Sequence, residues 1–268
     1  VYGFTAMPMK LIDDMQPDHV AVVFDVARKT FRSDIYSDYK ANRSEPPEEL
    51  VPQFALVREA TAALTLPAVE LAGFEADDMI ATYAAAAEAA GLATTIVSSD
   101  KDLMQLVRGD ITMLDPMKQR RIGAAEVVER FGVPPEKVVD VQALAGDATD
   151  NVPGVPGVGI KTAAELINTY GDLETLLARA DEIKQPKRRE NLLNFAEQAR
   201  ISRQLVMLRD DAPMPLELSA LSTPKRDMDR LTAFLKDQEF SRLLVRIGAD
   251  AVNANGNGAK LGGAVRSM

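Results

Sequence analysis

The sequence contains no cysteine and a single histidine, His19, among its 268 residues. Disulfide bonds, zinc-thiolate sites and thiol nucleophiles are therefore excluded, as is a metal site built from several histidines. Any bound metal ion would have oxygen ligands. No apolar run approaches the roughly 18 residues that a membrane-spanning helix needs, and residues 1–4 lack the basic start of a signal peptide. We therefore expect a cytoplasmic protein that has no membrane partner.

Hydrophobic residues make up 46% of the chain, which is enough to bury one large domain, or a core with a smaller lobe. The net charge of −9 would ordinarily disfavour nucleic acid as a partner. If the eight acidic residues named below form one metal site, they account for most of this charge. Divalent cations bound there would offset more of it.

Strands and helices are predicted to alternate over residues 1–145, which indicates an α/β fold with a parallel sheet. The predicted strands are short apolar or β-branched runs at residues 19–24, 68–71, 94–97 and 111–114. Apolar residues at helical spacing predict helices over residues 1–15, 50–66, 124–131 and 135–145, and an alanine-rich helix ending at Gly91. The chain starts abruptly in apolar residues without a start methionine, so we expect that a preceding segment is missing.

From residue 146 to residue 248 the prediction is almost entirely helical. The expected helices cover residues 163–170, 173–183, 191–208 and 230–248, with a basic turn at residues 184–189. Residues 249–268 are rich in Gly, Ala and Asn without periodicity, which predicts a disordered tail or a linker.

Four short acidic clusters lie at predicted turns. Asp25 and the pair Asp100 and Asp102 each follow a predicted strand, and we expect them to share one edge of the sheet. Glu75 and Asp78 are one helical turn apart and face the same way, whereas Asp77 joins them only if that turn is irregular or if it serves a second ion. Asp147 and Asp150 repeat the i, i+3 spacing.

Each acidic cluster alone is also compatible with a structural role, as an N-cap or as charge that complements a helix N-terminus. Together, however, these carboxylates would repel one another and shift their own pKa values unless a cation held them. Oxygen ligands alone select Mg²⁺ or Mn²⁺. Two such ions about 4 Å apart can hydrolyse a phosphodiester without a protein nucleophile, by activating water and stabilising the leaving oxygen.

A basic segment between residues 28 and 43 mixes cations with aromatic rings: Arg28, Lys29, Phe31, Arg32, Tyr36, Tyr39, Lys40 and Arg43. Charges for phosphates and rings for bases suit a nucleic-acid strand, but a solvated amphipathic helix has the same composition.

A glycine-rich turn follows the last acidic cluster and leads into a helix. Gly154, Gly157 and Gly159 allow main chain to approach a ligand, and the helix start can direct N–H groups at an anion. A nucleotide P-loop is the alternative, but Ile160 separates Gly159 from Lys161 and Thr162, which a P-loop requires to be contiguous. A plain Gly-Pro turn is a third possibility.

Five motifs, in this order along the chain, resemble the 5′-nuclease (flap endonuclease) domain of bacterial DNA polymerase I. They are Val-Val-Phe-Asp at residues 22–25, Tyr-Lys-Ala-Asn-Arg at 39–43, and the segments 73–78, 99–102 and 146–162. The similarity extends over about residues 1–248. The resemblance implies a parallel-sheet core of the PIN/FEN type over residues 1–145, with a helical arch at about 28–50. It also implies a helix-hairpin-helix lobe over residues 146–248 that grips duplex DNA.

The resemblance also implies roles for individual residues. The metal ligands would be Asp25, Glu75, Asp77, Asp78, Asp100, Asp102, Asp147 and Asp150, and the catalytic residues Lys40, Asp78 and Asp100, with Lys40 steadying the scissile phosphate. The DNA-binding residues would be Arg28, Arg32, Tyr36, Lys40 and Arg43 in the arch, and Gly154, Gly157, Gly159, Lys161 and Thr162 in the hairpin, where this family often holds K⁺.

By the same resemblance the chain is a Mg²⁺-dependent nuclease that removes 5′ flaps or 5′ nucleotides in primer removal and repair, with Mn²⁺ as a substitute. Its partners would be DNA with a 5′ flap or 5′ end, an RNA primer-DNA hybrid, and a polymerase domain in the same chain. We expect a nucleoid-associated monomer.

The chain departs from the family at its start, because family members begin with a strand carrying another metal-binding aspartate in a motif like Leu-Ile-Asp-Gly. Ile12-Asp13-Asp14 lies in a predicted helix and is no substitute. Two alternatives therefore stand beside the nuclease: a DNA-binding fragment that cannot cut, and a nucleotide-binding phosphotransferase that uses the glycine loop.

Overall fold

The computed structural model describes residues 1–248, and its contacts divide the chain into two compact units. Unit 1 contains Val1–Val22, Pro46–Ala68 and the segment from Leu221 onward, and unit 2 contains Val23–Glu45 and Val69–Ala220. The domain boundary predicted after residue 145 falls inside unit 2. Residues 249–268, predicted to be a disordered tail or linker, lie outside the described residues.

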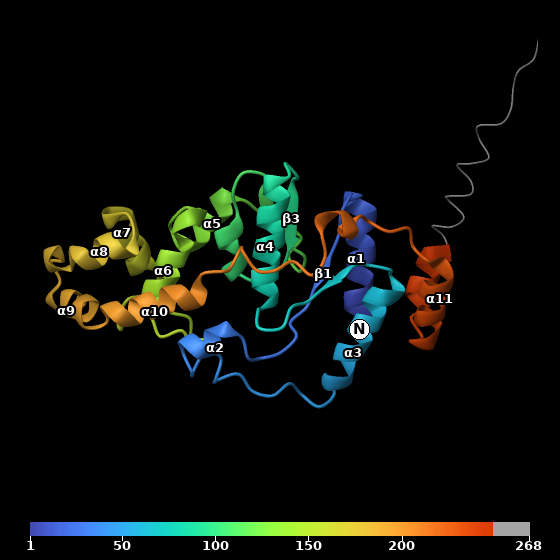
Figure 1. Ribbon diagram of the computed structural model, residues 1–268, viewed down its shortest axis with the longest axis horizontal. Coiled ribbons are helices and arrows are strands. Elements are labelled where there is room, and N and C mark those ends of the chain that lie inside the picture. The colour runs from blue at the N-terminus through green and yellow to red at the C-terminus, as the bar shows by residue number, and fades with distance from the viewer. Residues whose placement is uncertain (249–268) are drawn as a thin grey trace, which may run out of the picture. The chain divides into compact units, whose positions relative to one another are not determined.

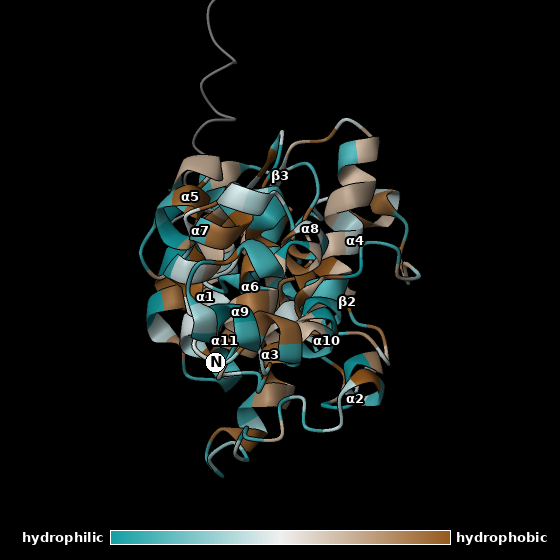
Figure 2. Ribbon diagram, turned by 90° about the vertical axis from the view of Figure 1, so that its left-hand side faces the viewer, coloured by the Kyte–Doolittle hydropathy of each residue, from teal (hydrophilic) through white to brown (hydrophobic). Residues whose placement is uncertain are grey.

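Unit 1 is built from helices α1 (Tyr2–Met15), α3 (Val51–Ala63) and α11 (Met228–Asp237), followed by helical residues 241–248. Met9, Leu64, Leu231 and Leu235 belong to its core. The helices drawn in Figure 2 carry both hydrophobic and hydrophilic residues, as amphipathic packing requires.

Two predictions for unit 1 need correction. The predicted helix over 230–248 is interrupted at residues 238–240, where Glu239 has a φ of 55°. The predicted core-facing helix over 50–66 faces the core only in its second half, because Phe54 in its first half is 49% exposed. The helix ends at Ala63, where Thr65 turns the chain with a φ of 58°, before Pro67 is reached.

The strands form two small sheets instead of one. β1 (Val22–Val23) pairs with β2 (Ala68–Val69), and a second sheet has the order β3 (Thr94–Val97), β4 (Ile111–Asp115) and β5 (Arg120–Ile122). β3 is parallel to β4, with Thr94 opposite Ile111, whereas β5 is antiparallel. The α/β fold is confirmed, but the prediction that Asp25 and Asp100 follow strands of one sheet is wrong. Strand β5 was not predicted, because its sequence Arg-Arg-Ile lacks the apolar pattern from which the strands were predicted.

The helices of unit 2 include one that packs against β3 and a group that forms a helical region away from the sheet (Figure 1). They are α2 (Phe31–Ile35), α4 (Ala76–Ala89), α5 (Ala124–Phe131), α6 (Val138–Ala145), α7 (Ile160–Tyr170), α8 (Leu173–Ala178), α9 (Pro186–Asn194) and α10 (Ala196–Val206). Short 3₁₀ helices are η1 (Asp102–Leu106), η2 (Pro135–Lys137), η3 (Ala180–Glu182) and η4 (Leu218–Leu221). The predicted basic turn at 184–189 is instead the start of α9, because proline is tolerated in the first helical turn.

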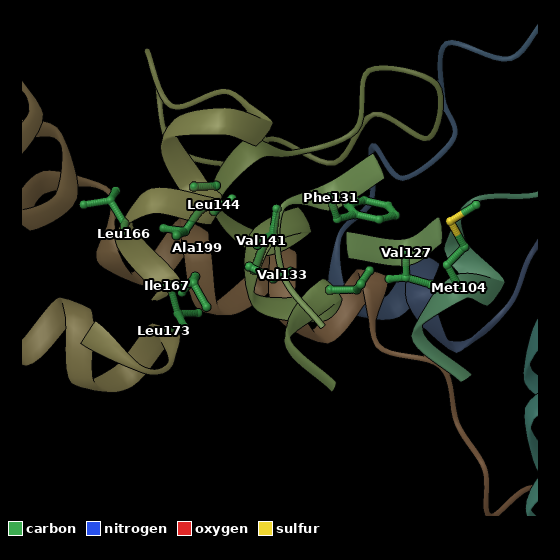
Figure 3. Close-up of a cluster of buried hydrophobic side chains, with 14 of the residues drawn as sticks. Met104, Val127, Phe131, Val133, Val141, Leu144, Leu166, Ile167, Leu173 and Ala199 are labelled. Carbon is green, nitrogen blue, oxygen red and sulfur yellow. The ribbon is translucent and has the colours of Figure 1, made fainter. Parts of the chain in front are cut away.

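One core extends from the β3-β4-β5 sheet into the helices of unit 2. Figure 3 shows Met104, Val127 and Phe131 at one end of this cluster and Leu166 and Ile167 of α7 at the other. Phe131, Leu144 and Ile167 are at most 2% exposed. The packing fixes the C-terminal end of α6, from which the glycine-rich hairpin departs.

Candidate functional site

A pocket in unit 2 is lined by five carboxylates from three separate stretches of the chain. Its polar lining consists of Arg32, Tyr39, Glu75, Asp77, Asp102, Asp147 and Asp150, and its apolar lining of Val152, Leu205, Val206 and Leu208. Folding thus brings together members of three of the predicted acidic clusters with two residues of the basic segment.

The N-terminus of α4 holds two of the predicted acids, Glu75 and Asp78. Glu75 is the N-cap and Asp78 the third helical residue, and each side chain pairs with the other's backbone N–H in a capping box. Asp78 has no exposed surface and binds both terminal nitrogens of Arg32, at 2.7 and 2.8 Å. Arg32 is itself 1% exposed and also donates through Nε to the carbonyl of Leu205.

This arrangement does not favour the predicted metal-binding and catalytic role of Asp78 or the predicted DNA contact of Arg32, and neither is part of the function proposed below. Both Asp78 oxygens already accept from Arg32 and from the backbone N–H groups of Glu75 and Arg209. A buried, fully hydrogen-bonded ion pair leaves no ligand position for a metal and no surface for a phosphate.

Asp77, between those two acids in sequence, lines the pocket instead. Burial, together with the nearby negative charges of Asp100 and Asp102, raises the pKa of Asp77 to about 7. The negative charges of Glu75 and Asp25 also raise the pKa of Asp77. Asp25 is exposed and accepts a hydrogen bond of 2.8 Å from the backbone N–H of Ala76, so it also lies at the start of α4.

The segment after β3 contributes a cation between its two acids. Asp100 Oδ1 accepts the N–H of Asp102, which opens η1. Asp102 Oδ1 accepts from Lys101 Nζ at 3.1 Å and from Gln142 Nε2 at 2.6 Å. Burial raises the pKa of Asp102, and these two donors act against that effect.

The segment after α6 binds cations through both of its acids. Asp147 Oδ2 contacts Lys101 Nζ, and Asp147 Oδ1 accepts the N–H of Thr149 at 2.7 Å. Burial alone would raise the pKa of Asp147, but Lys101 and the backbone of Thr149 lower it overall. Asp150 contacts Lys40 Nζ at 3.6 Å and also pairs with Arg43.

The Tyr-Lys-Ala-Asn-Arg motif at residues 39–43 packs against the loop that contains Asp147 and Asp150. Lys40 has a left-handed backbone with a φ of 57°, its N–H donates to the carbonyl of Asp150, and its Nζ lies 2.8 Å from Glu75 Oε2. Asn42 donates to the carbonyl of Ala148 and Asn151 to that of Asp38. Three hydrogen bonds, one between backbone groups and two from asparagine side chains, therefore hold the segment that carries the Lys40 ammonium.

Tyr39 differs from the expected base-stacking ring, because it is only 9% exposed. Its hydroxyl lies 3.2 Å from Glu75 Oε2 and 3.4 Å from Asp150 Oδ2. Burial beside Glu75 raises the pKa of Tyr39, so the phenol stays protonated and donates to these carboxylates. Tyr36 is half-buried and packs on the cluster that contains Tyr39 and Val152. Arg28 is exposed, as predicted for a DNA contact, and pairs with Glu45 at 2.7 Å.

The glycine-rich hairpin between α6 and α7 contains glycines of two kinds. Gly154 is buried, donates its N–H to Ser202 Oγ and accepts from Gln198 Nε2, so its predicted DNA contact is corrected. Gly157 and Gly159 are exposed, and Gly159 is the N-cap of α7. Lys161 is exposed and Thr162 half-buried in the first turn of that helix, where an anion can approach free N–H groups.

Whether the pocket fits a metal ion can be judged from its charges and its geometry. Burial and the neighbouring acids raise the pKa of Asp77, and a cation bound there would favour its carboxylate form. Within residues 1–248, however, no three carboxylates are arranged so that they could hold one ion. Lys40, Lys101 and Arg43 occupy carboxylate oxygens in this arrangement. The acids fit a divalent cation in chemistry and charge, provided that these side chains rearrange.

Three residues that contact the site acids or the loop that carries them were not predicted from the sequence. Lys101 lies between two predicted metal ligands, and its position in Asp-Lys-Asp was the signal that could have found it. Gln142 and Asn42 act through tertiary contacts, to Asp102 and to Ala148 respectively, for which a single sequence offers no signal.

Two family models match the chain in succession. The model described as "5′-3′ exonuclease, N-terminal resolvase-like domain" matches residues 1–132, and "5′-3′ exonuclease, C-terminal SAM fold" matches residues 133–230. Among the residues that the structure describes, no helix is long and apolar enough to cross a membrane.

The chain is 56% identical to DNA polymerase I of Rhizobium leguminosarum over 254 residues, which is 92% of this chain and 25% of that protein. It is 40% identical to DNA polymerase I of Bacillus caldotenax, covering 92% of this chain and 29% of that one. The chain thus spans about a quarter of the length of these relatives.

Among solved structures, T5 5′-exonuclease with bound zinc superposes with a TM-score of 0.70 at 24% identity, covering 88% of each chain. The catalytic core of Rad2 in complex with DNA substrate superposes with a TM-score of 0.57 at 16% identity, covering 88% of this chain and 78% of that one. At these identities the likeness establishes the fold alone.

Proposed function

Because the chain belongs to the 5′-3′ exonuclease family, we propose that it hydrolyses DNA phosphodiesters at 5′ flaps or 5′ ends with divalent metal ions, Mg²⁺ in the first place. The family matches confirm the predicted resemblance to the 5′-nuclease domain of bacterial DNA polymerase I. The main structural support for the proposal is the position of the Lys40 ammonium, which is held next to Glu75 among the acids that surround Asp77.

Asp77, Asp100, Asp102 and Asp147 are the proposed metal ligands, with Asp25 at the start of α4 completing the set. They are the predicted ligands that remain after Asp78 is excluded and after Glu75 and Asp150 are assigned to Lys40. Divalent ions bound there would supply an activated water and charge stabilisation at the phosphate.

Glu75 and Asp150 have a different role in this proposal. They hold Lys40 from two sides, while Tyr39 donates to both of them. An ammonium carries three donor hydrogens, so Lys40 retains a donor for a phosphate oxygen. A cation whose position is fixed before substrate arrives needs no reorganisation during the reaction.

DNA would be bound at two places in unit 2. Arg28 and Arg43 are exposed cations of the basic segment and are proposed to bind phosphates of the 5′ strand. Gly157, Gly159, Lys161 and Thr162 are proposed to bind the backbone of the duplex through N–H groups and charge, with K⁺ at the hairpin carbonyls. An RNA primer-DNA hybrid as substrate, and a polymerase domain in the same chain, belong to this proposal.

The test is cleavage of a 5′-labelled flap duplex by this chain, with Mg²⁺ and with EDTA, and with products resolved by length. We expect cuts near the junction only with Mg²⁺. Asp100→Ala should abolish cleavage, because it removes a proposed metal ligand. It should spare the fold and DNA binding, because Asp100 is exposed and, within residues 1–248, its side chain accepts a hydrogen bond only from the N–H of Asp102 at the start of η1. Cleavage by Asp100→Ala at the unaltered rate would refute the metal assignment, and binding without any cleavage by the unaltered chain would favour the DNA-binding alternative.

A further inference from the structure

Lys101 pairs with two of the acids that line the pocket, and the proposed reaction assigns it no role. Its Nζ lies 3.1 Å from Asp102 Oδ1 and also contacts Asp147 Oδ2. The side chain of Lys101 is 30% exposed, and those of Asp102 and Asp147 are 22% and 9% exposed. A single, partly exposed ammonium thus joins the acid after β3 to the acid after α6.

We propose that Lys101 is an internal counter-ion that takes the place of a divalent cation between Asp102 and Asp147, and that the cation binds by displacing it. The inference rests on the proposed function, because it takes both aspartates to be metal ligands. Two partly buried carboxylates repel each other unless a positive charge lies between them. An ammonium and a divalent ion would repel as well, so the two cations compete for the same oxygens.

The competition also explains why the carboxylates of the described chain form no ready group of three ligands. Asp102 Oδ1 and Asp147 Oδ2 both point at Lys101, and Asp147 Oδ1 is engaged by Thr149. Lys40 and Arg43 pair with Glu75 and Asp150 instead. Lys101 is accordingly the cation whose departure frees two of the proposed ligands at once.

Gln142 is placed to keep Asp102 in position during this exchange. Its side chain is 1% exposed, and its Nε2 donates to Asp102 Oδ1 at 2.6 Å. Its Oε1 is buried and has no hydrogen-bond partner within residues 1–248. Buried acceptors are normally satisfied, so an acceptor on the amide next to Asp102 is available to the displaced ammonium or to a water.

The test measures Mn²⁺ binding to the full chain, freed of metal with EDTA and dialysed, by the electron paramagnetic resonance signal of unbound Mn²⁺. Lys101→Met removes the charge and keeps most of the aliphatic side chain. We expect Lys101→Met to bind Mn²⁺ with a dissociation constant roughly 3- to 10-fold lower, because the competitor is gone. Its melting temperature should be lower in EDTA and should recover at saturating Mn²⁺.

The matched control is Lys118→Met, the same change at a lysine whose side chain is 75% exposed and 3.7 Å from Asp115. It should bind Mn²⁺ like the unaltered chain. If Lys101→Met does not fold without metal, Lys101→Arg keeps the charge and should also bind Mn²⁺ like the unaltered chain.

Two results would overturn the inference, and they are distinguishable. Mn²⁺ binding that is unchanged or weaker in Lys101→Met, while the unaltered chain binds, would show that Lys101 does not compete and would leave the proposed function intact. Absence of Mn²⁺ binding by the unaltered chain would refute the metal-dependent function itself, and the inference with it.

Discussion

At the scale of single residues, Lys40 shows how backbone geometry places a charge. Its left-handed conformation, with a φ of 57°, is uncommon for a residue other than glycine and costs about 1 kcal/mol or more. The hydrogen bond from its N–H to the carbonyl of Asp150, and that from Asn42 to Ala148, offset this cost. The result is an ammonium 2.8 Å from Glu75, aimed at the acidic pocket.

We expect Lys40→Met to reduce the single-turnover rate of flap cleavage by about 10²- to 10³-fold, the usual effect of removing one fixed donor to a developing charge. Binding of the flap duplex should change much less, because Lys40 is one phosphate contact among several. Quenched-flow cleavage and fluorescence anisotropy measure the two quantities. A cleavage rate within fivefold of the unaltered rate would exclude Lys40 from the reaction.

Asp77 makes the stability of the ion-free chain depend on pH. Its pKa is about 7 in the folded chain against an ordinary value of 3.8, so the folded chain binds more protons between those values. The resulting stabilisation is complete below pH 4 and is lost as the pH rises through 7. We expect the free energy of unfolding in EDTA to fall by about 2–4 kcal/mol from this group, measured by urea denaturation between pH 4.5 and 8.

Asp77→Asn is the matched variant for this measurement, because it removes the titrating group and keeps the shape of the side chain. Its unfolding free energy should depend less steeply on pH over the same range. Equal slopes for the two chains would show that Asp77 is ionised like an exposed aspartate. Saturating Mg²⁺ should also flatten the pH dependence of the unaltered chain, since a bound cation favours the carboxylate.

At the scale of elements, the buried pair of Arg32 and Asp78 joins α2 to the N-terminus of α4. Arg32 also donates to the carbonyls of Leu205 and Met207 at the end of α10, so three helices meet at one guanidinium. Such a pair is costly to desolvate and stabilises most when its polar atoms are hydrogen-bonded, as all three nitrogens of Arg32 and both oxygens of Asp78 are. Its effect on the site is to fix the helix that leads into Tyr39 and Lys40.

The hairpin between α6 and α7 depends on the close approach of Gly146 and Gly154. A Cβ at Gly154, where φ is +60°, would lie 2.4 Å from the backbone nitrogen of Gly146 and 2.6 Å from the carbonyl carbon of Ala145. These neighbours are backbone atoms and cannot turn aside. We expect Gly154→Ala to lower the free energy of unfolding by about 3 kcal/mol, from strain and overpacking together.

Gly159→Ala is the control for that variant in the same hairpin. A Cβ at Gly159 meets nothing within 4 Å, and its φ of −96° suits alanine. Chemical denaturation should show a change of less than about 1 kcal/mol for this variant. If both variants are equally stable, the contact between Gly146 and Gly154 does not determine the hairpin.

At the scale of the whole molecule, the net charge of −9 opposes DNA, so binding must come from local groups of cations. If Arg28, Arg43 and Lys161 neutralise phosphates, the logarithm of the binding constant should fall with the logarithm of salt concentration with a slope near −3. Anisotropy titrations of Asp100→Ala with flap DNA in NaCl measure the slope. A slope near zero would exclude these contacts.

The proposed K⁺ at the hairpin is tested by the same titration in KCl. Tighter binding in KCl than in NaCl would support it.

Local patterns in the sequence were sufficient for the α/β class, for most helices and for the acidic and glycine-rich segments. Helical spacing and short β-branched runs depend on neighbours within a few residues, so α1, α4, α5, β3 and β4 were predictable. The same local rules suggested that Glu75 and Asp78 face one way, and could not tell which acid of that helix start enters the pocket.

Only the tertiary structure decided how the charges are shared. Asp78 is withdrawn from the site because a buried Arg32 from a distant segment meets it, and Asp77 takes its place beside Asp102. Lys101 gains its role from a contact with Asp147 in the loop after α6, and Gln142 of α6 gains its role from a contact with Asp102. The N–H of Gly154 is bonded to Ser202 of α10, so it is not available to DNA. Ion pairing and burial depend on which segments meet in space, and no spacing along a single chain specifies that.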